Sequence, residues 1–116
     1  VIDVLGSGSA STNGYAAGFT APAATPNLSS IAVEAKTGVI TITTSKAAGN
    51  GSLLLVPFTG TTAAATGLPD ATAEFAVPDQ GTVSWRCLAK GATGPTGVTL
   101  AAAASLEARY APSECR

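Results

Sequence analysis

Two cysteines constrain this chain more than any other residues. Cys87 ends the segment Gly81-Thr-Val-Ser-Trp-Arg-Cys87, which is typical of a β-strand, and Cys115 is the second-last residue. A disulfide between them would tie a chain end, which normally frays, to a strand. In the chain-entropy model such a crosslink contributes roughly 3.5 kcal/mol. A single pair of cysteines fits an exported protein, and two reduced structural cysteines are the alternative.

The length and the missing residue types narrow the class of protein. A chain of 116 residues is enough for one domain with a modest core. It has no histidine, which removes the commonest general base and the commonest metal ligand. No run of about 18 apolar residues predicts a membrane span. The first residues, Val1–Leu5, lack the basic flank and long apolar run of a signal peptide.

Charge is sparse. Six Lys or Arg stand against seven Asp or Glu, and they are scattered along the chain. Strong nucleic-acid binding by this segment is therefore not expected. A surface of Thr, Ser, Gly and backbone has little long-range repulsion between copies, so it would tolerate dense packing against other copies of itself. Many small, Thr-rich exported domains have the same composition.

Alternation predicts an antiparallel sheet. Segments 30–35, 39–44 and 52–56 are β-rich and joined by short turns, which is typical of a meander, with Pro57 at the end of its third strand. Segment 82–87 is predicted as the last strand. Val83, Trp85 and Cys87 would share one face of it. We expect Trp85 to be a core residue, with an exposed ligand-stacking role as the alternative.

The remaining segments are predicted as loops and short helices. Val1–Leu5 resembles the last turn of a helix, stopped by the following Gly/Ser run. Segment 6–29 is a loop that Tyr15 and Phe19 anchor on the core. Segment 59–80 is a second loop, in which 71–77 forms a short strand or covers the sheet.

The loop between the cysteines is predicted to hold a helix. It begins with the turn region 91–97, and segment 99–109 then has high helix propensity with Thr99 as N-cap. Leu106 and Tyr110 are four positions apart, so both could face the sheet.

The order of these pieces resembles the globular domain of a bacterial type IV pilin, of the type IVa major-pilin group. In that family a Trp-x-Cys strand opens a disulfide loop, which Trp85-Arg-Cys87 matches. A Tyr-hydrophobic-Pro-x-x-Cys ending closes it, matched by Tyr110-Ala-Pro-Ser-Glu-Cys115. Gly38-Val-Ile-Thr-Ile-Thr43 is similar to the family's first sheet strands. The resemblance covers residues 31–116.

The resemblance implies an α+β pilin fold: a four-stranded antiparallel meander with a C-terminal loop bounded by the Cys87–Cys115 disulfide. Residues 1–116 would form one domain. Its parts would be 1–5, the tail of an N-terminal helix; 6–29, the αβ-loop; 30–87, the sheet; and 87–115, the disulfide loop. Most of the family's N-terminal helix is missing here. It was either trimmed away or is a separate polypeptide, as in two-chain pilins.

The resemblance also implies a function. The chain would be a structural subunit of a bacterial type IV pilus that polymerises into a helical filament used for adhesion, twitching motility or DNA uptake. Its partners would be other copies of itself, a separate N-terminal helix chain if there is one, and a host-surface ligand. It would be extracellular, on the cell-surface pilus, with a precursor in the inner membrane through the missing helix. The alternatives are the globular chain of a two-chain pilin, a pseudopilin of a type II secretion system, or a stand-alone exported binding domain.

No catalytic, cofactor or metal site is predicted. There is no Gly-x-Ser-x-Gly and no histidine to activate a serine or cysteine, so the chain is not expected to be an enzyme. Asp70, Glu74 and Asp79 could bind a cation, but their spacing matches no calcium loop, which favours solvated charges. Asn27-Leu-Ser29 and Asn50-Gly-Ser52 match the N-glycosylation pattern, which also occurs by chance.

Overall fold

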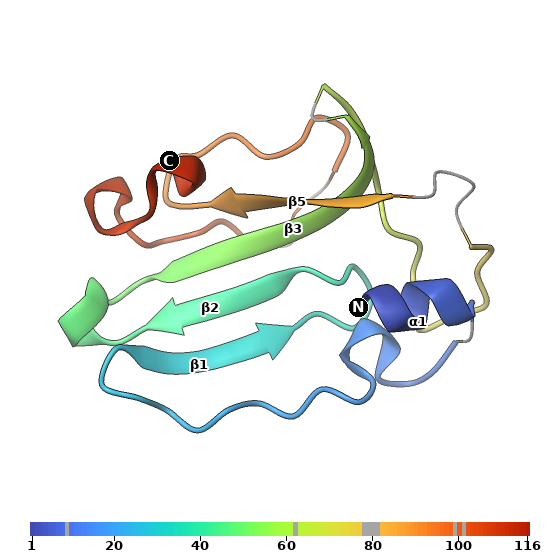
Figure 1. Cartoon of the computed structure of the whole chain (residues 1–116), viewed down its shortest axis with the longest axis horizontal. Coiled ribbons are helices and arrows are strands. Elements are labelled where there is room, and N and C mark those ends of the chain that lie inside the picture. The colour runs from blue at the N-terminus through green and yellow to red at the C-terminus, as the bar shows by residue number, and fades with distance from the viewer. Residues whose placement is uncertain (9, 62, 78–81, 99, 101) are drawn as a thin grey trace.

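The computed structural model describes residues 1–8, 10–61, 63–77, 82–98, 100 and 102–116. Within them a short helix precedes an antiparallel five-stranded sheet (Figure 1). The helix and strands are α1 (Ile2–Ser7), β1 (Leu28–Val33), β2 (Ile40–Thr44), β3 (Ser52–Thr61), β4 (Ala64–Gly67) and β5 (Val83–Leu88). Four short 3-10 turns lie at Gly14–Ala16, Lys46–Ala48, Ala108–Tyr110 and Ser113–Cys115.

β3 is the centre of the sheet. Along one edge it pairs first with β2, over Ser52–Leu55, and then with β4, over Phe58–Thr61. Its other edge pairs with β5 over Leu54–Thr59. The expected α+β architecture with an antiparallel sheet and a C-terminal disulfide is confirmed. The predicted four strands become five, because β3 continues past Pro57 and forms a hairpin with β4 in a segment predicted to be a loop.

Pro57 lies in the interior of β3, although the sequence suggested that it ends the strand. It is tolerated there because β2 pairs only as far as Leu55 and β4 begins at Phe58. On that edge Pro57 falls in the gap between the two ladders, where a residue without an N–H costs the sheet least.

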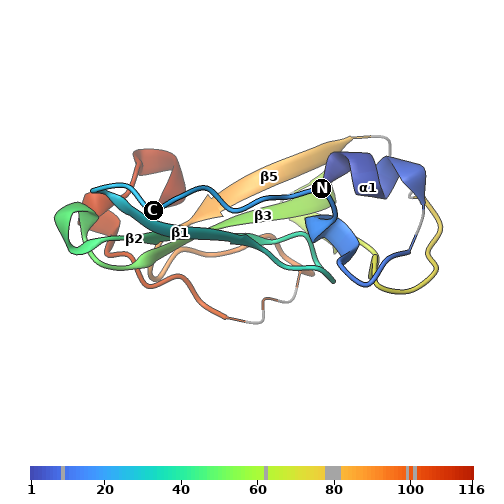
Figure 2. The ribbon, with the colours of Figure 1, turned by 90° about the horizontal axis from the view of Figure 1, so that it is seen from below.

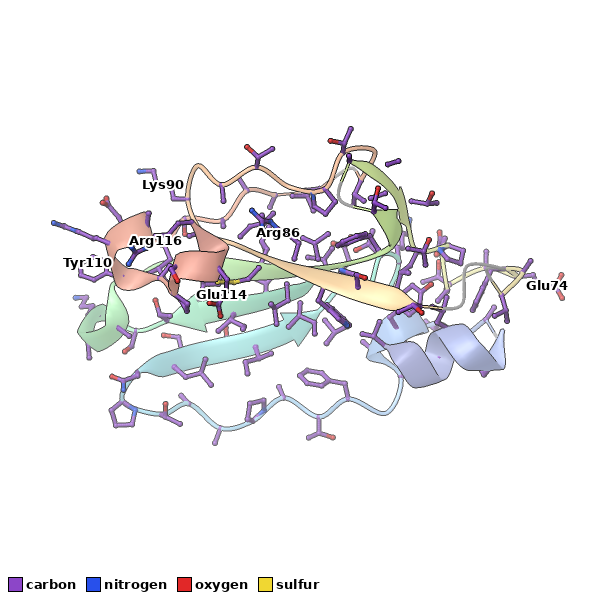
Figure 3. The ribbon with its side chains drawn as sticks, turned by 45° about the horizontal axis from the view of Figure 1, so that its top comes forward. Glu74, Arg86, Lys90, Tyr110, Glu114 and Arg116 are labelled. Carbon is purple, nitrogen blue, oxygen red and sulfur yellow. A yellow bond between two sulfur atoms is a disulfide. The ribbon has the colours of Figure 1, made fainter. Side chains whose placement is uncertain are left out.

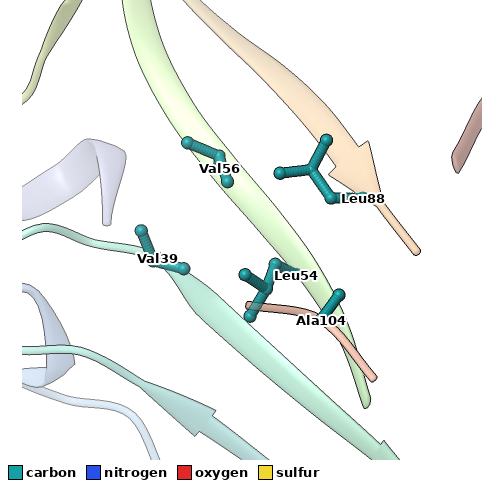
Figure 4. Close-up of a cluster of buried hydrophobic side chains, with 5 residues drawn as sticks. All are labelled: Val39, Leu54, Val56, Leu88 and Ala104. Atoms are coloured by element: carbon teal, nitrogen blue, oxygen red, sulfur yellow. The ribbon is translucent and has the colours of Figure 1, made fainter. Parts of the chain in front are cut away.

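Alternation along the strands gives the sheet two faces. The back face carries Leu54, Val56 and Leu88, which pack with Val39 and Ala104 in one buried cluster (Figure 4). The segment after β5 supplies Ala104 and runs behind the sheet (Figure 2). The front face carries the alternate residues of the same strands. α1 and the C-terminal turns lie on the front side, near opposite ends of the sheet (Figure 2).

α1 ends close to where the sequence predicted. It runs to Ser7, and Gly8 then adopts the left-handed conformation with φ 65°, which glycine reaches without steric cost. Leu5 is buried against Tyr15, Leu68 and Ala71, so the helix is fixed to the loops at this end of the sheet.

The predicted helix over 99–109 is wrong for the described residues. Residues 102–107 are irregular, and only Ala108–Tyr110 forms a 3-10 turn, whereas Thr99 lies outside the described residues. Backbone N–H groups of Ser105 and Leu106 donate to the Ser52 carbonyl of β3 at 3.1 and 2.9 Å. These N–H groups are bonded to β3 and cannot make the hydrogen bonds of a helix. Tertiary contacts therefore override the helix propensity of the alanines. Segment 71–77 forms no strand: residues 71–72 form a turn, residues 74–77 are irregular, and Ala71 is buried against Leu5 and Tyr15.

Candidate assembly surface

The front face of the sheet is apolar between its two ends. Register places Ile31 opposite Ile42, and Ile40 opposite Leu55. These side chains are only half-buried, unlike the buried Leu54 and Val56 of the back face. The apolar residues of the front face include Ile31, Val33, Ile40, Ile42, Leu55 and Trp85.

Trp85 is not a core residue, which corrects the prediction from sequence. Its side chain is 38% exposed. It lies opposite Pro57 on the front face, and Cys87, two residues further along β5, lies opposite Leu55 on the same face. The shared face was predicted correctly, but that face is covered mainly at its ends, by α1 and by the C-terminal turns (Figure 1).

A groove opens on the front face beside the start of α1. Its volume is about 310 Å³, and Val1, the N-cap of α1, contributes to its wall. The other lining residues are Tyr15, Ala17, Gly18, Phe19, Ile31, Val33 and Ile40. Figure 1 shows α1 running outward from its N-terminal end, which lies beside the sheet. An axis continued upstream from Val1 therefore points back across the sheet.

Tyr15 anchors the loop that precedes β1. It is 1% exposed, its backbone N–H donates to the Ala35 carbonyl at 2.9 Å, and its hydroxyl donates to the Pro69 carbonyl at 2.5 Å. Burial, and to a smaller extent the nearby Asp70 carboxylate, raises the pKa of Tyr15 to about 12. Phe19, predicted as a second anchor, is 41% exposed. Tyr15 therefore fixes the loop to the core, whereas Phe19 lies on the wall of the groove.

The C-terminal end is clamped to β5. Cys87 and Cys115 form a disulfide with their Cα atoms 4.6 Å apart. The Ala89 N–H donates to the Cys115 carbonyl at 2.7 Å, and the Lys90 N–H donates to the Leu106 carbonyl at 2.9 Å. The chain on both sides of the disulfide is thus paired with the extension of the strand.

The segment before the clamp passes very close to the turn between β2 and β3. An ideal Cβ built on Gly51 would lie 2.5 Å from the Leu106 Cα, so only glycine fits there. Leu106 is buried, as predicted. Tyr110 is 53% exposed, which corrects the prediction that it faces the sheet. Without a continuous helix the four-residue spacing does not align the two side chains, and the Arg109 guanidinium lies 4.8 Å from the Tyr110 ring centre.

The acidic loop holds no assembled metal site among the described residues. No group of three or more His, Cys, Asp or Glu side chains that could hold an ion occurs among them. The Asp70 carboxylate accepts hydrogen bonds from the side chain and backbone of Thr72, which lower the pKa of Asp70. Glu74 is exposed, and Asp79 lies outside the described residues. Nor is any helix in the described part long and apolar enough to cross a bilayer.

Comparison with known proteins decides the family. A scan against protein families matches Pilin (bacterial filament) over residues 2–116. The chain belongs to the pilin family. A search of curated proteins and a search of solved structures each found no match. Membership makes this a type IV pilin-like protein of a structural, non-enzymatic family whose members assemble into extracellular filaments.

The sequence reasoning missed the front face as a surface. The signal was present in Val39-Ile-Thr-Ile-Thr43, where isoleucine alternates with threonine, and in the uninterrupted Leu53-Leu-Leu55 of the next strand. A strand that is apolar on both sides must be covered on both sides. The described part of this pilin covers mainly the back face.

Proposed function

We propose that this pilin is a structural subunit of a bacterial type IV pilus and that an apolar N-terminal helix packs on its front face. The single observation that supports this is the half-buried apolar stripe lying between α1 and the C-terminal clamp. The groove beside Val1 lies where a helix extending α1 upstream would enter the stripe. Fully burying a large aliphatic or aromatic side chain contributes roughly 1.5–3 kcal/mol. Completing the burial of six such side chains would contribute several kcal/mol.

In this proposal residues 1–116 are one pilin domain. Segment 1–5 is the tail of the N-terminal helix, 6–29 is the αβ-loop, 30–87 contains the sheet, and 87–115 is the loop that Cys87 and Cys115 close. The helix is either continuous with α1 or supplied by a second polypeptide, as in a two-chain pilin. The intact mass of the native protein separates the two, because a spanning helix adds about 20 residues or more.

The mechanism in this proposal is assembly. Apolar helices bundle at the filament axis and anchor the precursor in the inner membrane, and each globular domain contacts its neighbours head to tail. Contacts of that kind generate a helical polymer when the rotation between successive copies does not close a ring. The filament serves adhesion, twitching motility or DNA uptake, without catalysis and without a cofactor, and a host-surface ligand is a further partner.

The only tryptophan of the chain reports on helix docking directly. Trp85 is partly exposed on the front face, so its emission in the isolated 116-residue chain should be that of a hydrated indole. In native filaments, or after addition of a separate helix chain, the emission should shift to shorter wavelength. An unchanged spectrum in intact filaments would refute helix packing on this face.

Two neighbouring substitutions give a matched test of the same proposal. Ile31→Asp places a charge on the front face, and Ala32→Asp places the same charge on an exposed position of the opposite face of β1. We expect Ile31→Asp to abolish filaments in cells that produce the pilin, and Ala32→Asp to leave them. Both isolated variants should be checked for folding by circular dichroism. Equal filament yields from the two folded variants would contradict the proposal.

A further inference from the structure

Arg86 is the one basic side chain of the sheet, and it lies in a cleft. It is on β5, opposite Val56, so its stem lies on the apolar back face. The side chain is half-buried and lines an open cleft of about 300 Å³. The other lining residues are Ala63, beside the β3–β4 turn, and Thr93, Gly94, Pro95 and Thr96.

The Arg86 guanidinium has no partner within the described residues. The one ion pair found there joins Arg109 to Glu107 at 3.9 Å, and Arg86 makes no hydrogen bond with any described residue. A guanidinium offers five N–H donors in a planar fork that matches a carboxylate. Its unpaired N–H groups remain accessible to solvent, because no buried side-chain nitrogen or oxygen among the described residues lacks a partner. The cleft therefore suits a carboxylate that enters from outside the chain.

Glu74 is the carboxylate that this pilin offers. It is exposed in the loop between β4 and β5, and among the described residues it makes no hydrogen bond or ion pair. Asp70, in the same loop, is already bound by Thr72. In the same loop, three residues after Glu74, the apolar side chain of Val77 is 50% exposed. The loop thus presents an exposed carboxylate and an exposed apolar side chain three positions apart in the sequence.

Glu74 and Arg86 are placed for contact between copies rather than within one. Figure 3 shows Glu74 projecting outward at the end of the molecule that carries α1, away from Arg86. Lys90 and Arg116 lie toward the opposite end of the molecule, where Glu114 also lies, and Arg86 lies between that end and Glu74 (Figure 3). Because Glu74 and Arg86 carry opposite charges at separate places on one copy, they can pair between two copies in a head-to-tail arrangement.

We propose that, in the filament, Glu74 of one copy enters the Arg86 cleft of a neighbouring copy and pairs with its guanidinium. The inference rests on the proposed function, since it names the contact by which globular domains meet. The two surfaces differ, so each copy uses both, and in the filament the contact can repeat from one copy to the next.

Charge exchange in the full-length pilin tests the pair. R86E and E74R should each lower the yield of sheared filaments by at least about tenfold, because each leaves two like charges facing. The double variant R86E/E74R should restore the yield to within about threefold of wild type, since every copy then carries the reversed pair. A double variant as poor as either single variant, or an E74R variant with wild-type yield, would overturn the pairing.

Glu114 provides the matched control. It is also exposed, so E114R makes the same charge change as E74R at another site. E114R should leave the filament yield within about threefold of wild type. R86E/E114R has the same net charge as R86E/E74R, but its yield should stay as low as that of R86E. Rescue by E114R would show that net charge alone acts, and would overturn the pairing.

Neutral variants keep the test decisive if R86E does not fold as an isolated chain. R86Q and E74Q should each lower the yield, and the double variant should lie no lower than the worse single variant, because one interaction is lost only once. Additive losses would overturn the pairing. Micromolar binding of acetate to the isolated chain, lost in R86Q, would also overturn it, because the cleft would then hold a small ligand.

The two proposals fail differently. A native protein that never forms filaments refutes the pilus function and this contact together. Filaments that form normally in wild type and across the whole charge series leave the pilus function standing and refute only the Glu74–Arg86 contact.

Discussion

Removing the disulfide should cost this pilin a large part of its stability, by an amount that loop length sets. Cys87 and Cys115 are 28 positions apart, for which the chain-entropy model gives roughly 3.5 kcal/mol at 25 °C. Unfolding 116 residues carries an entropy of roughly 240 cal/mol/K. The ratio of these values is a fall in Tm of roughly 15 °C. The hydrogen bond from Ala89 to Cys115 does not reduce this loss, because it does not constrain the unfolded chain.

Thermal and urea unfolding of the isolated chain, followed by circular dichroism, would measure the effect. The oxidised protein, the fully reduced protein and the Cys87→Ala/Cys115→Ala variant should be compared. Reduction keeps both sulfur atoms in place and isolates loop closure, whereas the double variant adds a packing loss at the buried Cys115. The urea m-value should rise in both, because the open chain exposes more surface. A fall in Tm below about 5 °C on reduction would refute the reasoning, and filament yield should fall with stability.

Three further predictions concern single side chains. Tyr15→Phe loses a buried hydrogen bond worth about 1 kcal/mol. The contribution of Tyr15 ionisation to wild-type stability is fully present below the ordinary tyrosine pKa of 10 and should be lost as the pH rises through the Tyr15 pKa of about 12, so pH-dependent melts of the variant should lack that decline. Gly51→Ala should lower the free energy of unfolding by at least about 2 kcal/mol, because the added Cβ meets the Leu106 backbone. Gly6→Ala should raise it by about 0.5–1 kcal/mol, because Gly6 lies on α1 with open space around it. Urea melts that give the two variants the same stability would contradict this packing. Trp85→Ala should cost the isolated chain less than about 1.5 kcal/mol yet lower filament yield, and normal filaments would count against burial of Trp85 on assembly.

The strands were predictable because their signal is local. The β-branched run that begins at Val39 and the alternation before Cys87 each specify a strand, and single cysteines at two places leave one intramolecular pairing. β4 was missed because Ala64-Ala-Thr-Gly67 has no strand pattern of its own and forms on an edge that β3 supplies. The alanine-rich segment before Glu107 was misassigned for the converse reason, since its helix propensity yields to hydrogen bonds with Ser52.

The candidate surface was harder to predict than the fold. Alternation places Trp85 and Cys87 on one face, but it does not say which face lacks a cover. That depends on where the segment after β5 runs, and it runs behind the sheet to place Ala104 against Leu54. The lack of an ion-pair partner for Arg86 likewise depends on neighbours that are distant in sequence. No sequence motif predicts it.

The position of β3 at the centre of the sheet also sets the order in which the pilin should fold. Its contacts with β2 and β4 close short loops, so this three-stranded unit can form early and quickly. β5 joins the opposite edge only after the longer connection beyond Gly67 has closed. The Cys87 thiol reaches its partner once β5 has docked. In pulse-labelling experiments during refolding, the rate of thiol loss should therefore report the completion of the sheet rather than its beginning.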